Sequence, residues 1–238
     1  MVAVVEHVQH LTPRMIRIVF GGEGLAGFGA GEFTDHYVKL RIGERTRTYT
    51  VREWDGERLT IDFVVHGDEG VAGPWAAAAQ PGDTLELRGP GGAYTPDPAA
   101  DWHLMIGDPS VVPAISASLA RVPEGRLVHV LLQGDGPEDE QPLESPGDLR
   151  VQWLHGGDEE RLADAVRALD WPEGAVHAFV HGEASAVRAL RRHLLAERGL
   201  PRESVSISGY WKRKRTEEGW REDKPEWNRL VEADLTAA

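Results

Sequence analysis

Arginine, threonine and tyrosine alternate in the segment RTYTVR, residues 47–52, and these side chains can bind a flat molecule that carries a phosphate. A β-strand sends alternate side chains to opposite faces, so Tyr49 shares a face with Arg47 and lies opposite Thr48 and Thr50. The tyrosine ring can stack on a planar ring, a threonine can hydrogen-bond the ring edge, and a guanidinium can hold an oxyanion. On these residues alone, an exposed strand with cross-strand pairs and solvated arginines is the commoner explanation.

Two segments that follow carry related chemistry: DFVVHGDEG at 62–70 and GPWAAAA at 73–79. Pro74 suits the first turn of a short helix, because proline lacks an N–H that this turn would leave unbonded anyway. The amides of such a turn point outward and suit a pyrophosphate. A lone histidine such as His66 at a strand end is usually only a satisfied polar group, so the motif does not by itself fix its role.

Four consecutive cations, Lys212, Arg213, Lys214 and Arg215, form a basic run near the end of the chain, directly after a tyrosine and a tryptophan. A basic run is usually a solvated face or a tail. The two aromatic residues indicate that this segment begins anchored on the protein. The run could attract an anionic ligand, since the rest of the chain is acidic.

Composition limits the class of protein. With 238 residues, 41% hydrophobic and 27% charged, the chain fits two globular domains. A formal net charge of −13 argues against a nucleic-acid binder or a protein that docks on anionic lipid.

Redox chemistry in this chain cannot use thiols, because it has no cysteine and therefore no disulfide and no cysteine-ligated iron–sulfur cluster. Any electron transfer needs a bound organic cofactor or a metal site without thiolate ligands. No apolar run approaches the roughly 20 residues that span a bilayer, and residues 1–10 lack the pattern of a signal peptide. We therefore expect a cytoplasmic protein without a membrane partner.

The first part of the chain reads as short strands separated by glycine-rich turns, which predicts a six-stranded antiparallel barrel over residues 1–98. The predicted strands are 3–8, 15–20, 36–42, 46–51, 59–65 and 84–88.

From residue 99 strands alternate with helices, which predicts a parallel sheet in a second domain, residues 99–238. The predicted strands are 102–106, 127–132, 149–154, 176–181 and 205–208, and the predicted helices follow Ser110, follow Gly157 and span 183–198. Ser110 is the expected N-cap of its helix, and Gly199 followed by Pro201 ends the last helix.

Ligands of open parallel sheets bind outside the carboxyl ends of the strands. Three loops leave that edge, at 107–110, 133–135 and 182–183. None carries the glycine-rich dinucleotide fingerprint or the P-loop, so the nucleotide signal from the residues is weak. A buried Asp108 that caps its own helix is an alternative to a ligand role, and both can hold together.

RTYTVR, DFVVHG, PGD with GPGG, GDPSVVPAI, HGEASAVRALRRHL and GYWKRKRTEE occur in an order that covers nearly the whole chain. In this order the chain resembles the siderophore-interacting proteins, which are FAD-containing ferric-siderophore reductases of the ferredoxin-reductase superfamily. The resemblance implies that FAD sits in a cleft of the barrel domain and that NAD(P)H binds the second domain.

The resemblance also implies the site residues. For the cofactors it gives Arg47, Thr48, Tyr49, Thr50, Asp62, Val64, His66, Ala72, Trp75 and Ala76 on the flavin side, and Asp108, Ser110 and Glu183 on the nucleotide side. For the substrate it gives a cationic rim of Lys39, Lys212 and Arg215. It implies no catalytic acid or base and no resident metal. Pro109 stands where the family commonly has glutamate, and KRKR replaces a single arginine, which leaves open which cation faces the substrate.

The function that follows is a monomeric NAD(P)H-dependent reductase that reduces a ferric siderophore through FAD and releases Fe(II). One alternative is a general flavin or ferredoxin-type reductase without siderophore preference. Another is a module that binds the siderophore without reducing it. The choice between NADH and NADPH stays open: Asp135 could bind a ribose hydroxyl and disfavour a 2′-phosphate, and Arg188 could do the opposite.

Overall fold

The computed structural model describes residues 1–65, 70–158 and 160–236. Contacts within the chain divide it into two compact units. The N-terminal unit comprises Met1–Pro96, Val112–Arg121 and Glu138–Glu144, and the C-terminal unit comprises Asp97–Val111, Val122–Pro137 and the chain from Ser145 onward. The assignment of residues 1–98 and 99–238 to two ligand-binding domains stays a prediction.

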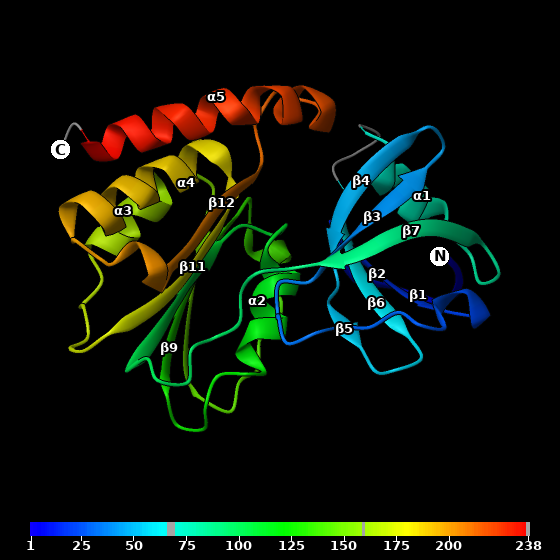
Figure 1. Ribbon diagram of the computed structural model, residues 1–238, viewed down its shortest axis with the longest axis horizontal. Coiled ribbons are helices and arrows are strands. Elements are labelled where there is room, and N and C mark those ends of the chain that lie inside the picture. The colour runs from blue at the N-terminus through cyan, green and yellow to red at the C-terminus, as the bar shows by residue number, and fades with distance from the viewer. Residues whose placement is uncertain (66–69, 159, 237–238) are drawn as a thin grey trace. The chain divides into compact units, whose positions relative to one another are not determined.

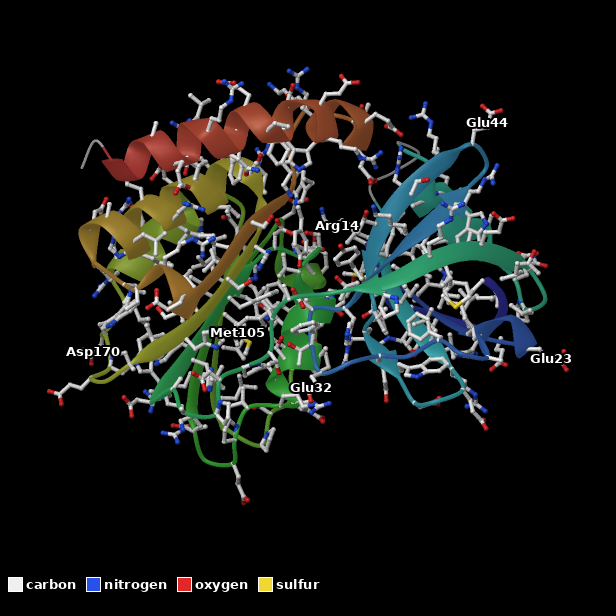
Figure 2. The ribbon with its side chains drawn as sticks, viewed as in Figure 1. Arg14, Glu23, Glu32, Glu44, Met105 and Asp170 are labelled. Atoms are coloured by element: carbon white, nitrogen blue, oxygen red, sulfur yellow. The ribbon has the colours of Figure 1, made fainter. Side chains whose placement is uncertain are left out.

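The N-terminal unit is built on one seven-stranded antiparallel sheet with the strand order β4-β3-β7-β1-β2-β6-β5. Its strands are β1 (Val2–Thr12), β2 (Met15–Gly21), β3 (Tyr37–Ile42), β4 (Arg45–Thr50), β5 (Glu53–Trp54), β6 (Leu59–Val64) and β7 (Thr84–Gly91). The six predicted strands are present, and two-residue β5 is the addition. Figure 2 places Glu44 at the tip of the turn between β3 and β4.

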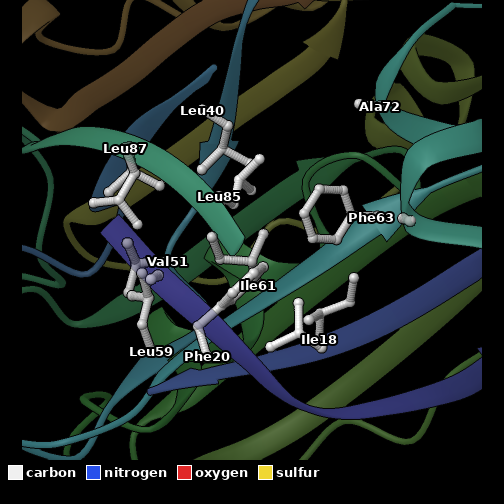
Figure 3. Close-up of a cluster of buried hydrophobic side chains, with 14 of the residues drawn as sticks. Ile18, Phe20, Leu40, Val51, Leu59, Ile61, Phe63, Ala72, Leu85 and Leu87 are labelled. Atoms are coloured by element: carbon white, nitrogen blue, oxygen red, sulfur yellow. The ribbon is translucent and has the colours of Figure 1, made fainter. Parts of the chain in front are cut away.

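The sheet curls, although among the described residues no strand pairing joins β4 to β5 or β6. The ring of Tyr49 on β4 nevertheless lies 4.5 Å from the ring of Phe63 on β6, centroid to centroid. A core closes the space inside this curl, with Ile18, Phe20 and Ile61 essentially inaccessible to solvent (Figure 3). Along β2 the buried Ile18 and Phe20 alternate with half-buried Arg17 and Val19, the period-2 pattern expected of a strand.

The C-terminal unit contains a five-stranded sheet, parallel throughout, with the order β10-β9-β8-β11-β12. Its strands are β8 (Trp102–Gly107), β9 (Leu127–Gly134), β10 (Asp148–His155), β11 (Val176–Glu183) and β12 (Val205–Trp211). The predicted fold class, an antiparallel sheet followed by a parallel α/β part, is confirmed. The order reverses between β9–β10 and β11–β12, and β8 is the central strand from which both halves extend.

Helices α3 (Arg161–Arg167), α4 (Ala184–Arg191) and α5 (Glu217–Thr236) gather beside β11 and β12 in Figure 1. A π-type turn (Arg192–Glu197) extends α4. The chain then leaves the helix through Gly199 at a φ of 68°, as expected for a glycine C-cap. The expectation for Ser110 is wrong in detail, because α2 (Val112–Leu119) begins two residues later and the hydroxyl of Ser110 donates to Asp108.

One buried ion pair joins β2 to β6 inside the N-terminal sheet. The carboxylate of Asp62 is nearly inaccessible and accepts from Nε and Nη2 of Arg17 at 2.7 and 2.8 Å. The bond to Asp62 raises the pKa of Arg17, against the opposing effect of burial. This fork geometry satisfies both carboxylate oxygens, which a buried charge requires.

We expect Asp62→Ala to lower the free energy of unfolding by about 2–3 kcal/mol, because it leaves the half-buried guanidinium of Arg17 without its partner. Urea titration of the purified chain measures the effect. Glu86→Ala is the matched control, since the Arg41–Glu86 pair lies in the same unit with side chains 62% and 60% exposed, and we expect a loss below about 1 kcal/mol there. Equal losses at both positions would contradict this interpretation of the buried pair.

Candidate functional site

An aromatic cluster lies where β4, β6 and α1 (Ala72–Ala78) meet in the N-terminal unit. The ring of Phe63 is 4.5 Å from Tyr49 and 5.7 Å from Trp75, so two predicted flavin-site residues pack on the same phenylalanine. Tyr49 and Trp75 are half-buried, whereas Phe63 is fully buried. The cluster therefore fixes two aromatic rings while leaving part of each accessible to a ligand.

The predicted alternation along β4 is confirmed in the pairing with β3. Arg47 and Tyr49 pair with the buried Leu40 and Val38, while exposed Thr48 lies opposite Lys39. The guanidinium of Arg47 is largely buried and donates through Nη1 to the carbonyl of Thr46 at 3.0 Å. Strand alternation thus puts Lys39 and Thr48 on one face of the hairpin and Tyr49 on the other.

Small residues surround the end of β6. Ala72 and Ala76 of α1 are buried, and a Cβ added to Gly73 would lie 3.4 Å from Cα of Val65, directly after half-buried Val64. The short helix expected from Pro74 to Ala79 is present, but it spans Ala72–Ala78 and so begins two residues earlier, with Pro74 in its first turn. His66 lies outside the described residues. The carboxylate of Asp62, which was predicted to bind the cofactor, is occupied by Arg17.

At the carboxyl edge of the parallel sheet, Asp108 accepts four hydrogen bonds. Oδ1 accepts from the amide of Ser110 at 2.9 Å and from its hydroxyl at 2.5 Å. Oδ2 accepts from the amide of Glu183 at 2.8 Å and from the indole Nε1 of Trp211 at 2.9 Å. Burial raises the pKa of Asp108, and the four donors oppose that shift. The carboxylate therefore joins the ends of β8, β11 and β12.

Glu183 makes a second junction at the same edge. Its Oε2 accepts from the amides of Ser185 and Ala186 at 2.6 and 3.2 Å, which caps α4, and its Oε1 accepts from the amide of Arg213 at 3.1 Å. The three predicted nucleotide-site residues Asp108, Ser110 and Glu183 therefore lie in one hydrogen-bonded group. The carboxylates of Asp108 and Glu183 hold these loops together through internal donors.

The basic run separates into distinct positions. Lys212 is half-buried with Nζ 5.9 Å from the ring centroid of Trp220, whereas Arg213, Lys214 and Arg215 are exposed. Lys214 has a φ of 62°, which turns the chain, and Nε of Arg215 pairs with Asp223 of α5 at 2.7 Å. The segment is anchored as its aromatic residues indicated, since Trp211 bonds Asp108.

The donor set of the N-terminal unit fits FAD. Tyr49 and Trp75 offer aromatic faces, Thr48 and Thr50 offer hydroxyls, and Arg47 offers a guanidinium for a phosphate. The described residues contain no group of three histidine, aspartate or glutamate side chains that could hold a metal. The same part of the chain contains no helix long and apolar enough to cross a membrane.

Two features of the site were not predicted. The indole of Trp211 donates to Asp108 across 103 residues of sequence, and Phe63 supports both Tyr49 and Trp75. The position of Phe63 in an alternating strand predicted burial, but only the curl of the sheet brings it to Tyr49. Nothing in local sequence links Trp211 to Asp108, although the aromatic pair before the basic run indicated an anchor.

Two family models match successive parts of the chain, in the same order as the motifs. The model described as "Siderophore-interacting FAD-binding domain" matches residues 4–46 and 43–94. The model described as "Siderophore-interacting protein" matches residues 100–214. The first match contains the aromatic cluster and Arg47, and the second contains Asp108, Glu183 and most of the basic run.

Individual relatives agree with these matches. The chain is 35% identical over 248 residues to the ferric vibriobactin reductase ViuB of Vibrio cholerae, covering 91% of this chain and 90% of that protein. A siderophore utilization protein from T. fusca superposes with a TM-score of 0.79 at 34% identity, covering 91% and 94% of the two chains. The ferredoxin reductase of a carbazole 1,9a-dioxygenase superposes with a TM-score of 0.70 at 19% identity, covering 89% of this chain and 69% of that one, which shows a shared fold. The chain belongs to the siderophore-interacting protein family.

Proposed function

We propose that the protein binds FAD and uses NADH or NADPH to reduce a ferric siderophore, which releases Fe(II). The observation that carries the proposal is the aromatic cluster beside the buried guanidinium of Arg47, within the residues matched by the family's FAD-binding domain. The name of ViuB, a ferric vibriobactin reductase, supports a ferric chelate as substrate. We further propose a monomer that acts in the cytoplasm.

In this proposal the chain's own residues bind and orient rather than transfer protons. Tyr49 and Trp75 hold a planar ring, Arg47 binds a phosphate oxygen, and Thr48, Thr50, Val64, Ala72 and Ala76 shape the surroundings. The chemistry that bound FAD supplies is to accept two electrons as a hydride from a nicotinamide and to release them singly to Fe(III). Two ferric chelates are thus reduced for each nucleotide oxidised, with one proton released.

The carboxyl edge of the parallel sheet is the proposed binding place of the nicotinamide nucleotide. Asp108 and Glu183 accept backbone and side-chain donors there and thereby hold the loops after β8, β11 and β12 in fixed positions. Fixed loops present their remaining amides to a pyrophosphate without further ordering, which lowers the entropic cost of binding. Ligands of open parallel sheets commonly bind at this edge.

Cations are the proposed contacts of the ferric chelate, since many such chelates are anionic. Lys39 is exposed on β3, and Arg215 is exposed in the basic run with Asp223 as its partner. Lys212 belongs to the same predicted rim, although it lies half-buried beside Trp220. Charges of this kind raise the rate at which an anionic substrate is captured, an effect that salt screens.

The proposed activity is tested on the purified protein loaded with FAD. We expect a yellow protein whose flavin absorbance is bleached anaerobically by NADH or NADPH and restored by a ferric siderophore, with Fe(II) captured by a ferrous-specific chelator. Bleaching by dithionite but by neither nucleotide would contradict nicotinamide-driven reduction. Equal turnover of ferric siderophores and of ferricyanide would favour a general reductase, and siderophore binding without any bleaching would favour a binding module.

We expect Arg47→Ala to weaken FAD binding by about 1.5–3 kcal/mol, because a charge-assisted hydrogen bond to a phosphate is lost. Fluorescence titration of flavin-free protein with FAD measures the change. Arg45→Ala is the matched control, since Arg45 is the exposed arginine of the same strand, and its affinity for FAD should stay near that of the unchanged protein. Equal weakening in both variants would show that Arg47 makes no specific phosphate contact.

We expect Lys39→Glu to raise KM for an anionic ferric chelate several-fold and to leave the FAD content unchanged, because the exposed ammonium attracts the substrate without supporting the fold. The effect should shrink at high salt, since the Debye length is about 8 Å at physiological ionic strength. Steady-state reduction at two ionic strengths measures it, with a cationic ferric chelate as the comparison substrate. An equal loss for both chelates would place Lys39 outside substrate recognition.

A further inference from the structure

A cavity of about 300 Å³ opens on the helical side of the C-terminal unit. It is formed by the start of α3, the first turns of α4, the start of the π-type turn, the end of β12 and the middle of α5. Its lining residues are Glu160, Ser185, Arg188, Ala189, Arg192, Lys212 and Trp227. All of these elements belong to the C-terminal unit, so the cavity is complete within it.

The lining is strongly cationic in an otherwise acidic protein. Arg188, Arg192 and Lys212 face a single carboxylate, Glu160, which leaves a formal charge of +2. Partners outside the lining act on both signs of charge, since Oε2 of Glu160 lies 3.6 Å from Nη1 of Arg167 and Nε of Arg192 lies 3.6 Å from Oε1 of Glu197. The two arginines stand four residues apart on one helical face and reach the same space. A dianionic group is therefore the complementary ligand.

The cavity adjoins the edge where the nucleotide is proposed to bind. Ser185 follows Glu183 by two residues and donates its amide to that carboxylate at 2.6 Å. Lys212 directly follows Trp211, whose indole bonds Asp108 at 2.9 Å. The two junctions that shape the carboxyl edge thus also place two lining residues of the cavity. A dinucleotide that lies along this edge can extend one end into it.

The volume of the cavity and the chemistry of its lining residues suit a nucleoside phosphate. The volume is at the lower end of the range of small-molecule pockets, about 300–1,000 Å³. A phosphomonoester carries a charge of about −1.5 to −2 at neutral pH and suits guanidinium forks. The largely buried indole of Trp227 adds an aromatic wall beside the cations.

From this arrangement we infer that the cavity binds the 2′-phosphate end of NADPH and makes NADPH the preferred reductant over NADH. The inference rests on the proposed nicotinamide-driven reduction. Arg188 and Arg192 hold the phosphate oxygens, and Lys212 adds a third cation from the end of β12. Lys212 then contributes to recognition of the nucleotide in addition to its place in the cationic rim proposed for the iron chelate.

The experiment uses the full chain loaded with FAD and compares Arg188→Ala and Arg192→Ala with Arg229→Ala. Arg229 is the matched control, a 76% exposed arginine of α5 paired with Glu226. The first readout is calorimetric binding of adenosine 2′-monophosphate, adenosine 5′-monophosphate and inorganic phosphate. The second is kcat/KM for NADPH and for NADH with ferricyanide as acceptor, which takes siderophore recognition out of the measurement.

We expect the unchanged protein to bind the 2′-monophosphate in preference to the 5′-monophosphate and to prefer NADPH. Each cavity variant should lose about tenfold in both affinity for the 2′-monophosphate and kcat/KM for NADPH, with NADH unaffected. The Arg229→Ala variant should behave as the unchanged protein. Lys212→Ala should also lower kcat/KM for NADPH, measured with ferricyanide as the acceptor so that recognition of the chelate does not enter the result.

Failure of the inference and failure of the proposed function give different results. Equal use of NADH and NADPH, unchanged by the cavity variants, overturns the inference and leaves the reductase intact. The inference is also overturned if inorganic phosphate binds as tightly as the 2′-monophosphate. It is overturned as well if the cavity variants lose activity only toward the ferric chelate. Binding of the 2′-monophosphate that depends on Arg188 and Arg192, without bleaching by either nucleotide, supports the site and contradicts nicotinamide-driven reduction.

Discussion

The carboxylate of Asp108 is the constraint on which the C-terminal unit depends. It accepts donors from Ser110, Glu183 and Trp211, which come from the ends of three different strands. A buried carboxylate is costly unless its lone pairs are satisfied, and the four donors reduce that cost. Burial still raises the pKa of Asp108, so desolvation outweighs the hydrogen bonds that favour the charged form. Removing any one donor shifts that balance and loosens the ends of β11 and β12 together.

The hydrogen bonds of Asp108 also require a glycine at position 182. Gly182 has a φ of 128°, and a Cβ at that position would lie 2.4 Å from Oδ2 of Asp108. Only glycine therefore allows the loop after β11 to pass close enough for the amide of Glu183 to reach the carboxylate. Glu183 then caps α4 and accepts the amide of Arg213, so the position of the basic run follows from the same contact. The path of the loop after β11 and the position of the basic run therefore both depend on the contact between Asp108 and Glu183.

Periodicity predicted most of the fold, because burial on one face of a strand or helix leaves a direct mark on the sequence. The strands of both sheets and the helix that ends at Gly199 were predicted in this way. Helix α5 was not predicted, although Trp220, Trp227 and Val231 share one buried face, because Pro225 interrupts the pattern. Contacts between distant segments leave no local mark, and so the bonds of Trp211 to Asp108 and of Arg17 to Asp62 were missed. The family resemblance identified Asp62 and Glu183 as cofactor-binding positions, but only their geometry shows that their carboxylates accept hydrogen bonds from internal donors.

These internal bonds explain how a chain of net charge −13 can present an attractive surface to anions. Two carboxylates at the proposed nucleotide edge, Asp108 and Glu183, accept from amide, hydroxyl and indole donors that offset their negative potential. The remaining acidic residues are spread over the chain, and salt screens exposed charges beyond about 8–10 Å. Arg188, Arg192 and Lys212 share one partly enclosed cavity, where screening is weaker. Local arrangement, rather than net charge, therefore determines which ligands this surface attracts.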